Sequence, residues 1–265
     1  MKDTSWGNVA DWYDEVVKGD DSYQKKVILP NILRLVTPRK GLRVLDLACG
    51  QGFFSHEMAK AGAEVVGVDI SKELIEQAKK GGAKNTSGER VVGAKRTSEL
   101  EVFFVTPATD LSVLGEKRFD VVVLILAIQN IEDISKTFKE VSRVLEPKGK
   151  FIIVLNHPAF RVPKKSSWSF DESAKVQFRR VDEYLSESRA EIEMNPSREK
   201  GSEKTVSFHR PLQVYSKTLA NAGFAISRVE EWTSHKQSEK GPRQIAENKA
   251  RKEIPLFMCL ECSKI

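Results

Sequence analysis

The stretch RVLDLACGQG, residues 43–52, decides the fold class of this 265-residue chain. After Arg43, its first half is an apolar run interrupted only by Asp46, which predicts a buried β-strand, and the two glycines that follow predict a tight turn. Residues 53–61 then predict a helix, with Gly62 as its C-terminal cap. A strand that runs through a glycine-containing turn into a helix is the repeating unit of a parallel α/β sheet.

The same alternation continues on both sides of this unit. Upstream, residues 22–37 predict an amphipathic helix, kinked at Pro30 and ended by Pro38. Further predicted strands cover residues 64–70, 101–105, 119–127, 150–155, 224–232 and 256–262, and further predicted helices follow Ser71, span 131–145 and span 211–222. Because the links are short, we predict a doubly wound α/β sheet with right-handed crossovers.

The polar residues 157–210 interrupt this rhythm and show no clean period. They carry too few large apolar side chains to form a stable unit alone, so we predict a substrate-cap insertion over the carboxyl edge of the sheet. The chain, residues 1–265, is then a single domain with an N-terminal helical lid (1–39) and a core sheet formed by 40–156 and 211–265. A second polar stretch, 234–250, carries no predicted element.

Composition restricts the class of protein. The longest apolar run, residues 121–128, is too short to cross a membrane, and the N-terminus lacks the apolar stretch of a secretory signal. Cys49, Cys259 and Cys262 cannot form a disulfide framework. Cys259 and Cys262 should face opposite sides of a strand, and we predict no metal site there. We therefore expect a cytoplasmic protein that has no membrane partner.

The glycine turn and the end of the next strand predict a nucleoside pocket. In an open parallel sheet, ligands bind beyond the carboxyl ends of the strands. Gly50 and Gly52 let a ligand approach the backbone closely. Asp69, 17 residues beyond Gly52, can accept hydrogen bonds from both hydroxyls of a ribose. A dinucleotide fingerprint would have a third glycine where Ser55 stands, which argues against a nicotinamide-dependent dehydrogenase.

The string VLDLACGQG, followed by Asp69, resembles the class I S-adenosylmethionine-dependent methyltransferases. The resemblance covers residues 40–156 and resumes at 211–262. It implies a Rossmann-like sheet of seven strands, mostly parallel with an antiparallel last strand, and S-adenosyl-L-methionine as the cofactor. The cofactor contacts implied by the resemblance are Asp46, Ala48, Gly50, Gly52, Asp69, Ile70, Ala108 and Leu126.

In this family the turn after the first strand cups the methionine end of the cofactor, with backbone carbonyls near Ala48 meeting the ammonium group. Asp69 would bind the ribose, and Ile70 would pack on the adenine. The family usually has an acid beside the adenine amino group after the third strand. Pro107 stands there in this chain, which leaves the adenine contact to the backbone of Ala108.

The acceptor side gives weaker signals. The Asn/Asp-Pro-Pro-aromatic motif of enzymes that methylate base nitrogens is missing after the fourth strand. The strings NHPAFR (156–161), SSW (166–168) and FHRPL (208–212) resemble a bacterial subgroup of small-molecule methyltransferases. Imidazoles titrate near neutral pH, so His157 and His209 are the candidate catalytic bases. The candidate acceptor contacts are Gln129, Arg161, Trp168 and Tyr215, and Trp12, Tyr13 and Tyr23 are candidates for the lid over the cofactor.

Each of these residues also has a structural interpretation, as a hydrogen-bonding histidine, a helix cap, a surface arginine or a core aromatic. We predict a methyltransferase that transfers a methyl group from S-adenosylmethionine to an oxygen, nitrogen or sulfur atom of a small molecule. Two alternatives stay open. Basic side chains in residues 79–96 favour a tRNA or rRNA methyltransferase. Pro107 and the lack of an obvious base favour a non-catalytic S-adenosylmethionine-binding protein.

Overall fold

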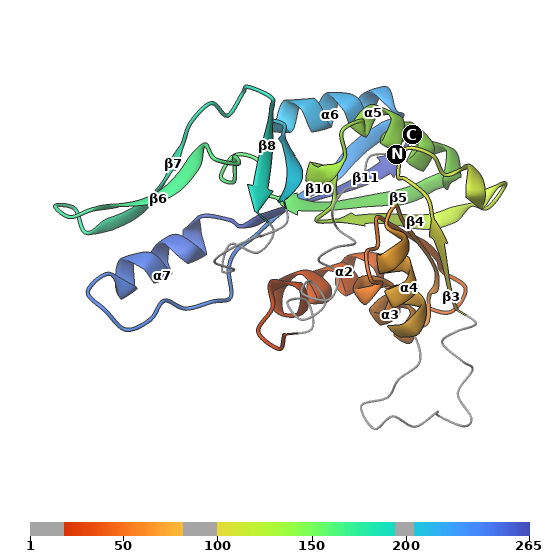
Figure 1. The fold of residues 1–265 in the computed structure, drawn as a ribbon, viewed down its shortest axis with the longest axis horizontal. Helices are drawn as coiled ribbons and strands as arrows, with labels where there is room; N and C mark the ends of the chain where they lie inside the picture. The colour runs from red at the N-terminus through yellow and green to blue at the C-terminus, as the bar shows by residue number, and fades with distance from the viewer. Residues whose placement is uncertain (1–18, 82–99, 194–203) are drawn as a thin grey trace.

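The computed structural model describes residues 19–81, 100–193 and 204–265. Its centre is a seven-stranded sheet in the order β10-β11-β5-β4-β1-β2-β3 (Figure 1). The strands are β1 (Arg43–Leu47), β2 (Glu64–Asp69), β3 (Glu101–Val105), β4 (Phe119–Ile125), β5 (Leu145–Asn156), β10 (Phe224–Trp232) and β11 (Phe257–Lys264). The last strand, β11, runs antiparallel to β5 and β10, and the other neighbours pair in parallel. The Rossmann-like, doubly wound α/β fold is confirmed.

Helices cover both faces of this sheet (Figure 1). On one face lie α2 (Leu29–Val36) and α3 (Phe53–Lys60), and on the other lie α5 (Ile134–Val144) and α6 (Leu212–Asn221). The remaining helix of this part, α4 (Lys72–Gly81), packs against β2 and β3. Because each helix turns an apolar stripe toward the sheet, both sheet faces are buried, as the apolar runs of the central strands predict.

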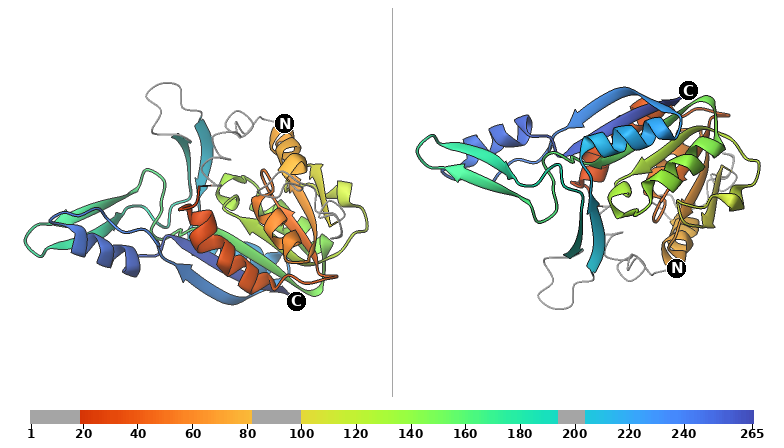
Figure 2. Two further views of the ribbon diagram at one scale, coloured as in Figure 1. Left: turned by 90° about the horizontal axis from the view of Figure 1, so that it is seen from below. Right: turned by 90° about the horizontal axis from the view of Figure 1, so that it is seen from above.

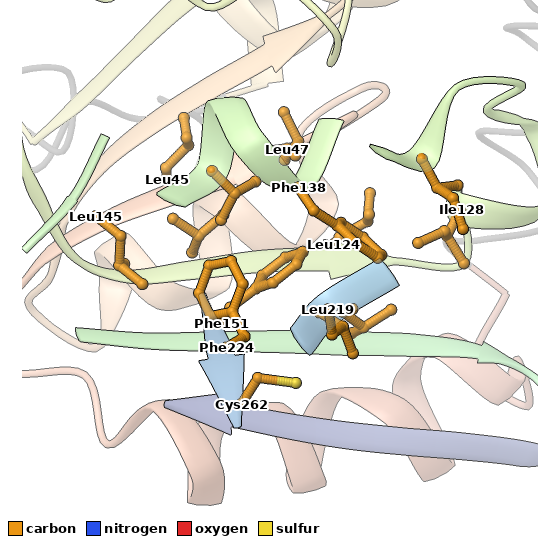
Figure 3. Packing of buried hydrophobic residues seen from close by; sticks show 14 of the residues in the cluster. Leu45, Leu47, Leu124, Ile128, Phe138, Leu145, Phe151, Leu219, Phe224 and Cys262 are labelled. Atoms are coloured by element: carbon orange, nitrogen blue, oxygen red, sulfur yellow. The ribbon is translucent and has the colours of Figure 1, made fainter. Parts of the chain in front are cut away.

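Of the three buried clusters in the described residues, the largest lies between the sheet and helices α5 and α6. Figure 3 shows Phe138 of α5, Phe151 of β5, Leu219 of α6 and Phe224 of β10 packed together. The ring centroids of Phe138 and Phe151 lie 5.6 Å apart in an edge-to-face arrangement. This cluster fixes β4 and β5, whose carboxyl ends determine where a ligand can bind.

The two cysteines of β11 lie on opposite faces of the sheet, as their alternation predicts. Cys262 belongs to the cluster under α5 and α6, and Cys259 belongs to the cluster under α2 and α3. Burial raises the pKa of each thiol to about 12. Both side chains therefore act as small apolar core residues.

The N-terminal helix begins with a π-helical turn, η2 (Gln24–Ile28), that leads directly into α2. Pro30 is the second residue of α2, directly after this π-helical turn, and has no N–H to donate to the turn before it. Thr37 closes the helix in a left-handed conformation, with φ of 49°. The predicted lid residues Trp12 and Tyr13 lie outside the described residues.

The polar insertion and the second polar stretch contain elements for which we predicted none. They form two hairpins and a helix: β6 (Ser166–Asp171) with β7 (Val176–Val181), β8 (Ser188–Glu193) with β9 (Lys204–His209), and α7 (Gln244–Glu253). Their apolar signal is weak because these strands bury one face at most, and α7 buries only Ala250. Figure 2 shows that β6, β7 and α7 project together from one end of the sheet, and α7 packs on β7.

Other boundaries shift by a few residues. The predicted fifth strand, 150–155, begins earlier, at Leu145, because β5 pairs with β4 on both sides of a register shift. Two single-turn 3₁₀ helices, η4 (Ser112–Leu114) and η5 (Ile128–Asn130), flank β4. Among the described residues, no helix combines the length and apolarity of a membrane span, and no three acidic, histidine or cysteine side chains gather as a metal site.

Candidate functional site

A cavity of about 800 Å³ opens at the carboxyl ends of β1, β2 and β4. Its floor is the turn that follows β1, and its sides come from the ends of β2, β3 and β4. The hairpin of β8 and β9 forms the facing wall. The cavity therefore lies where an open α/β sheet binds its ligands, close to the centre of the strand order.

The turn after β1 takes an unusual backbone path. Ala48 and Gly50 both have φ near +57°, and Gly52, with φ of 81°, starts α3 as its N-cap. The N–H of Cys49 donates to the carbonyl of Val68 at 2.9 Å, which ties the turn to β2. Left-handed backbone costs an L-residue roughly 1–2 kcal/mol, so glycine is favoured at such positions. The path leaves the Gly50 backbone open to the cavity.

Asp69 is held by the backbone on both sides of its carboxylate. Its Oδ2 accepts a hydrogen bond from the Gly50 N–H at 2.9 Å, and its Oδ1 accepts one from the Ser71 N–H at 2.9 Å. Burial raises its pKa above the usual range, although these two bonds act in the opposite direction. The side chain is thus fixed in one orientation at the cavity wall, and each oxygen keeps a lone pair for a ligand.

Asp46 lies deeper, at 2% exposure, and accepts a hydrogen bond from the Ser55 hydroxyl at 2.6 Å. Burial is the main cause that raises its pKa from 3.8 to about 7, and the nearby Asp69 adds to it. Gln51 also lines the cavity, and neither its amide nitrogen nor its amide oxygen has a partner among the described residues. Two buried carboxyl groups and an unpartnered amide favour a cationic, polar ligand.

The wall opposite the turn is built from β8, β9 and η5. The Asn130 amide nitrogen donates to the Val206 carbonyl at 2.8 Å, which ties β9 to η5. Lys204, Val206 and Phe208 alternate along β9 and line the cavity together with Arg189 of β8. This wall therefore offers an apolar surface with a basic rim.

A family model described as a methyltransferase domain matches residues 38–187, which is 150 of the 265 residues. The chain belongs to this methyltransferase domain family. The match spans the turn after β1, Asp69, β4 and both strands of the β6–β7 hairpin. It ends just before β8, so most of the cavity wall formed by β8 and β9 lies outside it.

Named relatives agree with this membership of the methyltransferase domain family. A ubiquinone biosynthesis O-methyltransferase from Pelagibacter ubique is 32% identical over 120 residues, 45% of this chain and 44% of the relative, so the chain spans less than half of that protein. An uncharacterised protein from Haemophilus influenzae is 26% identical over 84% of this chain and 83% of its own length. The solved structure of an S-adenosylmethionine-dependent methyltransferase from Mesorhizobium loti has a TM-score of 0.65 at 23% identity, covering 89% of this chain and 96% of that one, and supports the fold.

The predicted cofactor residues of the methyltransferase domain gather at the cavity. The lining residues among them are Asp46, Ala48, Gly50, Asp69, Ile70, Ala108 and Leu126. Gly52 does not line it, because its Cα faces the protein interior: an added Cβ would lie 3.1 Å from Ala78 Cβ and 3.2 Å from the Phe103 ring. Pro107 lines the cavity beside Ala108.

The two glycines of the turn therefore serve different purposes, and their alanine variants should differ. Both variants carry the left-handed backbone cost of roughly 1–2 kcal/mol. A Cβ on Gly50 meets nothing within 4 Å, whereas one on Gly52 meets three side chains. We expect Gly52→Ala to lower the melting temperature more than Gly50→Ala, and calorimetry would measure both. Equal melting temperatures for the two variants would contradict this division.

The two histidines proposed as bases lie away from the cavity. His157 is 5% exposed, its Nδ1 accepts from the Ala159 N–H at 3.3 Å, and its Nε2 lies 2.7 Å from a Glu231 carboxylate oxygen. Burial lowers its pKa, against the opposite effect of Glu231. His209 is 4% exposed, and its Nε2 lies 2.7 Å from the Tyr184 carbonyl. His157 ties the start of the insertion 157–210 to β10, and His209 of β9 ties two segments of that insertion to each other.

We accordingly expect His157→Ala and His209→Ala to lower stability and to change the rate of methyl transfer by less than about tenfold. Each variant removes a buried imidazole ring together with its hydrogen bond, and the bond alone contributes about 0.5–1.5 kcal/mol. Thermal unfolding and single-turnover rates would measure the two effects separately. A rate that falls by about 10²–10⁴ in either variant would restore that histidine as the base.

The predicted acceptor contacts also lie outside the cavity lining. Tyr215 is buried in the cluster under α5 and α6, and the Gln129 amide donates back to the Leu126 carbonyl. Trp168 lies on β6, and Arg161 lies before that strand. The predicted lid residue Tyr23 is also outside the cavity lining and shares a hydrogen bond with the Ser234 hydroxyl at 3.0 Å. Gln129 thus contacts the predicted cofactor residue Leu126, whereas Arg161, Trp168 and Tyr215 do not line the cavity.

The residues of the wall formed by β8, β9 and η5 were not predicted from the sequence. A signal was present, because KTVSFH (204–209) alternates polar and apolar side chains, as a half-buried strand does. Thr109, Phe53 and Phe54 were also missed as lining residues. The two phenylalanines follow the glycine turn directly, and a ligand seated on that turn would contact them.

Proposed function

We propose that this chain is an S-adenosylmethionine-dependent methyltransferase acting on an oxygen, nitrogen or sulfur atom of a small molecule. The observation that carries the proposal is one cavity that holds two buried carboxyl groups, Asp46 and Asp69, beside the left-handed turn at Gly50. A ligand with a ribose and two positive charges matches this set. The names of the Pelagibacter relative and of the Mesorhizobium structure support the same activity.

The residues present fit this cofactor. Asp69 is oriented to accept hydrogen bonds from the ribose hydroxyls, and Ile70 and Ala108 offer apolar contact for the adenine. The unpartnered Gln51 amide and the turn around Ala48 would hold the methionine end, with Asp46 balancing positive charge. When bound, S-adenosylmethionine supplies a methyl group already activated by its sulfonium.

With an activated donor, the protein has to align the acceptor and exclude water. The β8–β9 wall can do both, because Val206 and Phe208 present apolar surface across the cavity from the turn. We assign no general base, since an anionic oxygen, a thiolate or an uncharged amine needs none. A cytoplasmic location is part of the proposal, and the three free cysteines fit a reducing compartment.

The test is transfer of label from methyl-labelled S-adenosylmethionine. The purified protein is incubated with a metabolite extract in one reaction and with total RNA in another, and Asp69→Ala serves as the control protein. We expect label on a low-molecular-weight product with the natural chain only. Label on RNA would favour the nucleic-acid alternative, and donor binding without any labelled product would favour the non-catalytic alternative.

A further inference from the structure

Three arginines come from neighbouring segments beyond the carboxyl end of β5, apart from the methyl-transfer cavity. Arg161 follows the turn that leaves β5, Arg179 belongs to β7, and Arg251 belongs to α7, the helix that packs on β7. Arg179 Nε donates to the carbonyl of Phe160 at 2.8 Å, which is the peptide group directly before Arg161. These three side chains are called the arginine cluster below.

The arginine cluster has no acidic partner within the described part of the chain. Arg161 is half-buried and makes no hydrogen bond or ion pair there. Arg179 donates to two neutral oxygens, the Phe160 carbonyl and the Ser166 hydroxyl, and stacks 5.2 Å from the Trp168 ring centroid. Arg251 donates to the Ser238 hydroxyl at 3.0 Å. Among the described residues, Arg179 and Arg251 therefore have only neutral hydrogen-bond partners, and Arg161 has none.

Other arginines close to the arginine cluster do have acidic partners. Arg180, the next residue on β7, lies 3.1 Å from Asp182, and Arg243, at the start of α7, pairs with Glu172. Both of these side chains are more exposed than Arg161 and Arg179. The exposed Arg180 and Arg243 are thus paired with acids, whereas the half-buried Arg161 and Arg179 are not.

Grouping like charges in a half-buried place is unfavourable. Burial, and then the charge of Arg179, lower the pKa of Arg161 to about 10. Arg251 acts in the same direction. An anion bound among these groups would remove the repulsion and satisfy their free donors. Guanidinium groups bind phosphate through paired N–H···O bonds, and a dianion balances more of three positive charges than a carboxylate does.

We propose that Arg161, Arg179 and Arg251 form a binding subsite for a phosphomonoester group. The Trp168 ring, which lies under Arg179, gives the subsite an aromatic wall. None of the three arginines lines the cavity of Asp46 and Asp69. The subsite is independent of the proposed methyl transfer, and its test does not require methyltransferase activity.

The first test is binding of simple anions to the full chain at constant ionic strength. Inorganic phosphate and glycerol phosphate are compared with dimethyl phosphate, a singly charged diester, and with acetate. We expect calorimetric affinities for the two dianions at least tenfold higher than for the two monoanions, and a rise in melting temperature with phosphate. No response to phosphate overturns the subsite, and equal binding of dimethyl phosphate or acetate overturns the phosphomonoester assignment.

The second test uses Arg161→Met, with Arg180→Gln, the residue after Arg179 on β7, as the matched control. We expect Arg161→Met to raise the melting temperature in phosphate-free buffer, because it removes an unpaired charge, and to weaken phosphate binding at least tenfold. Arg180→Gln should bind phosphate as the natural chain does. Arg251→Gln, on a different element, should also weaken binding, so the test does not depend on one variant folding. Unchanged phosphate binding in both Arg161→Met and Arg251→Gln, or an equal loss in Arg180→Gln, overturns the assignment.

Discussion

Asp69→Ala is expected to lower the affinity for S-adenosylmethionine by at least about a hundredfold. Two hydrogen bonds from ribose hydroxyls to this carboxylate would be charge-assisted, worth about 1.5–3 kcal/mol each, and tenfold in affinity corresponds to about 1.4 kcal/mol. The carboxylate also accepts from the Gly50 and Ser71 N–H groups, so its removal loosens the turn that forms the cavity floor. Isothermal titration calorimetry with the donor measures the change.

Two further variants separate binding from folding. Asp69→Asn keeps the size of the side chain but puts an amide NH₂ group where a backbone N–H or a ribose hydroxyl needs an acceptor. This variant should therefore lose most of the donor affinity that Asp69→Ala loses. Asp120→Asn weakens the interaction with Arg43 at the opposite end of the sheet. That variant should lower the melting temperature and leave donor affinity unchanged. Donor affinity in Asp69→Ala equal to that of the natural chain would remove the carboxylate from the cofactor site.

The fold and the turn side of the cavity could be predicted because their determinants are local. Asp46, Gly50 and Asp69 each sit at the end of a strand that the apolar pattern defines, and parallel strands bring their carboxyl ends to one edge. The conformation of the turn is encoded in the glycines themselves. Gly52 was assigned to the ligand because spacing alone does not tell which way a Cα faces.

The acceptor side could not be predicted because it depends on contacts between distant segments. His157 reaches Glu231, 74 residues away, and Asn130 reaches Val206, 76 residues away. Neither contact has a local signature in the sequence. The charged strands of the two hairpins carry too little apolar periodicity to be distinguished from loops, and the wall of the cavity therefore came only with the structure.

Donor binding should depend on pH through Asp46. In the folded protein the pKa of this buried carboxyl is raised from 3.8 to about 7, so it is protonated below pH 7 in the free protein. The folded state favours the neutral carboxyl group of Asp46. The stabilisation that this group contributes is therefore complete below about pH 4 and is lost as the pH rises toward 7. A cationic ligand favours the carboxylate and lowers this pKa. Binding below pH 7 therefore releases a proton.

The expected result is that donor affinity rises with pH up to about 7, by as much as tenfold per unit, and is constant above it. Besides burial, the groups that shift the pKa of Asp46 are Ser55 and His56 of α3 and Asp69 of β2. The pKa of Asp69 is itself raised. Asp46→Asn keeps the shape and cannot titrate, so its profile should flatten between pH 5.5 and 7.5, a range of roughly one and a half units below to half a unit above the transition. Titrations in two buffers of different ionisation enthalpy count the released protons directly. Proton release that persists undiminished in Asp46→Asn would mean that another group carries the linkage, and that the charge balance at the floor of the cavity is set by Asp69 alone.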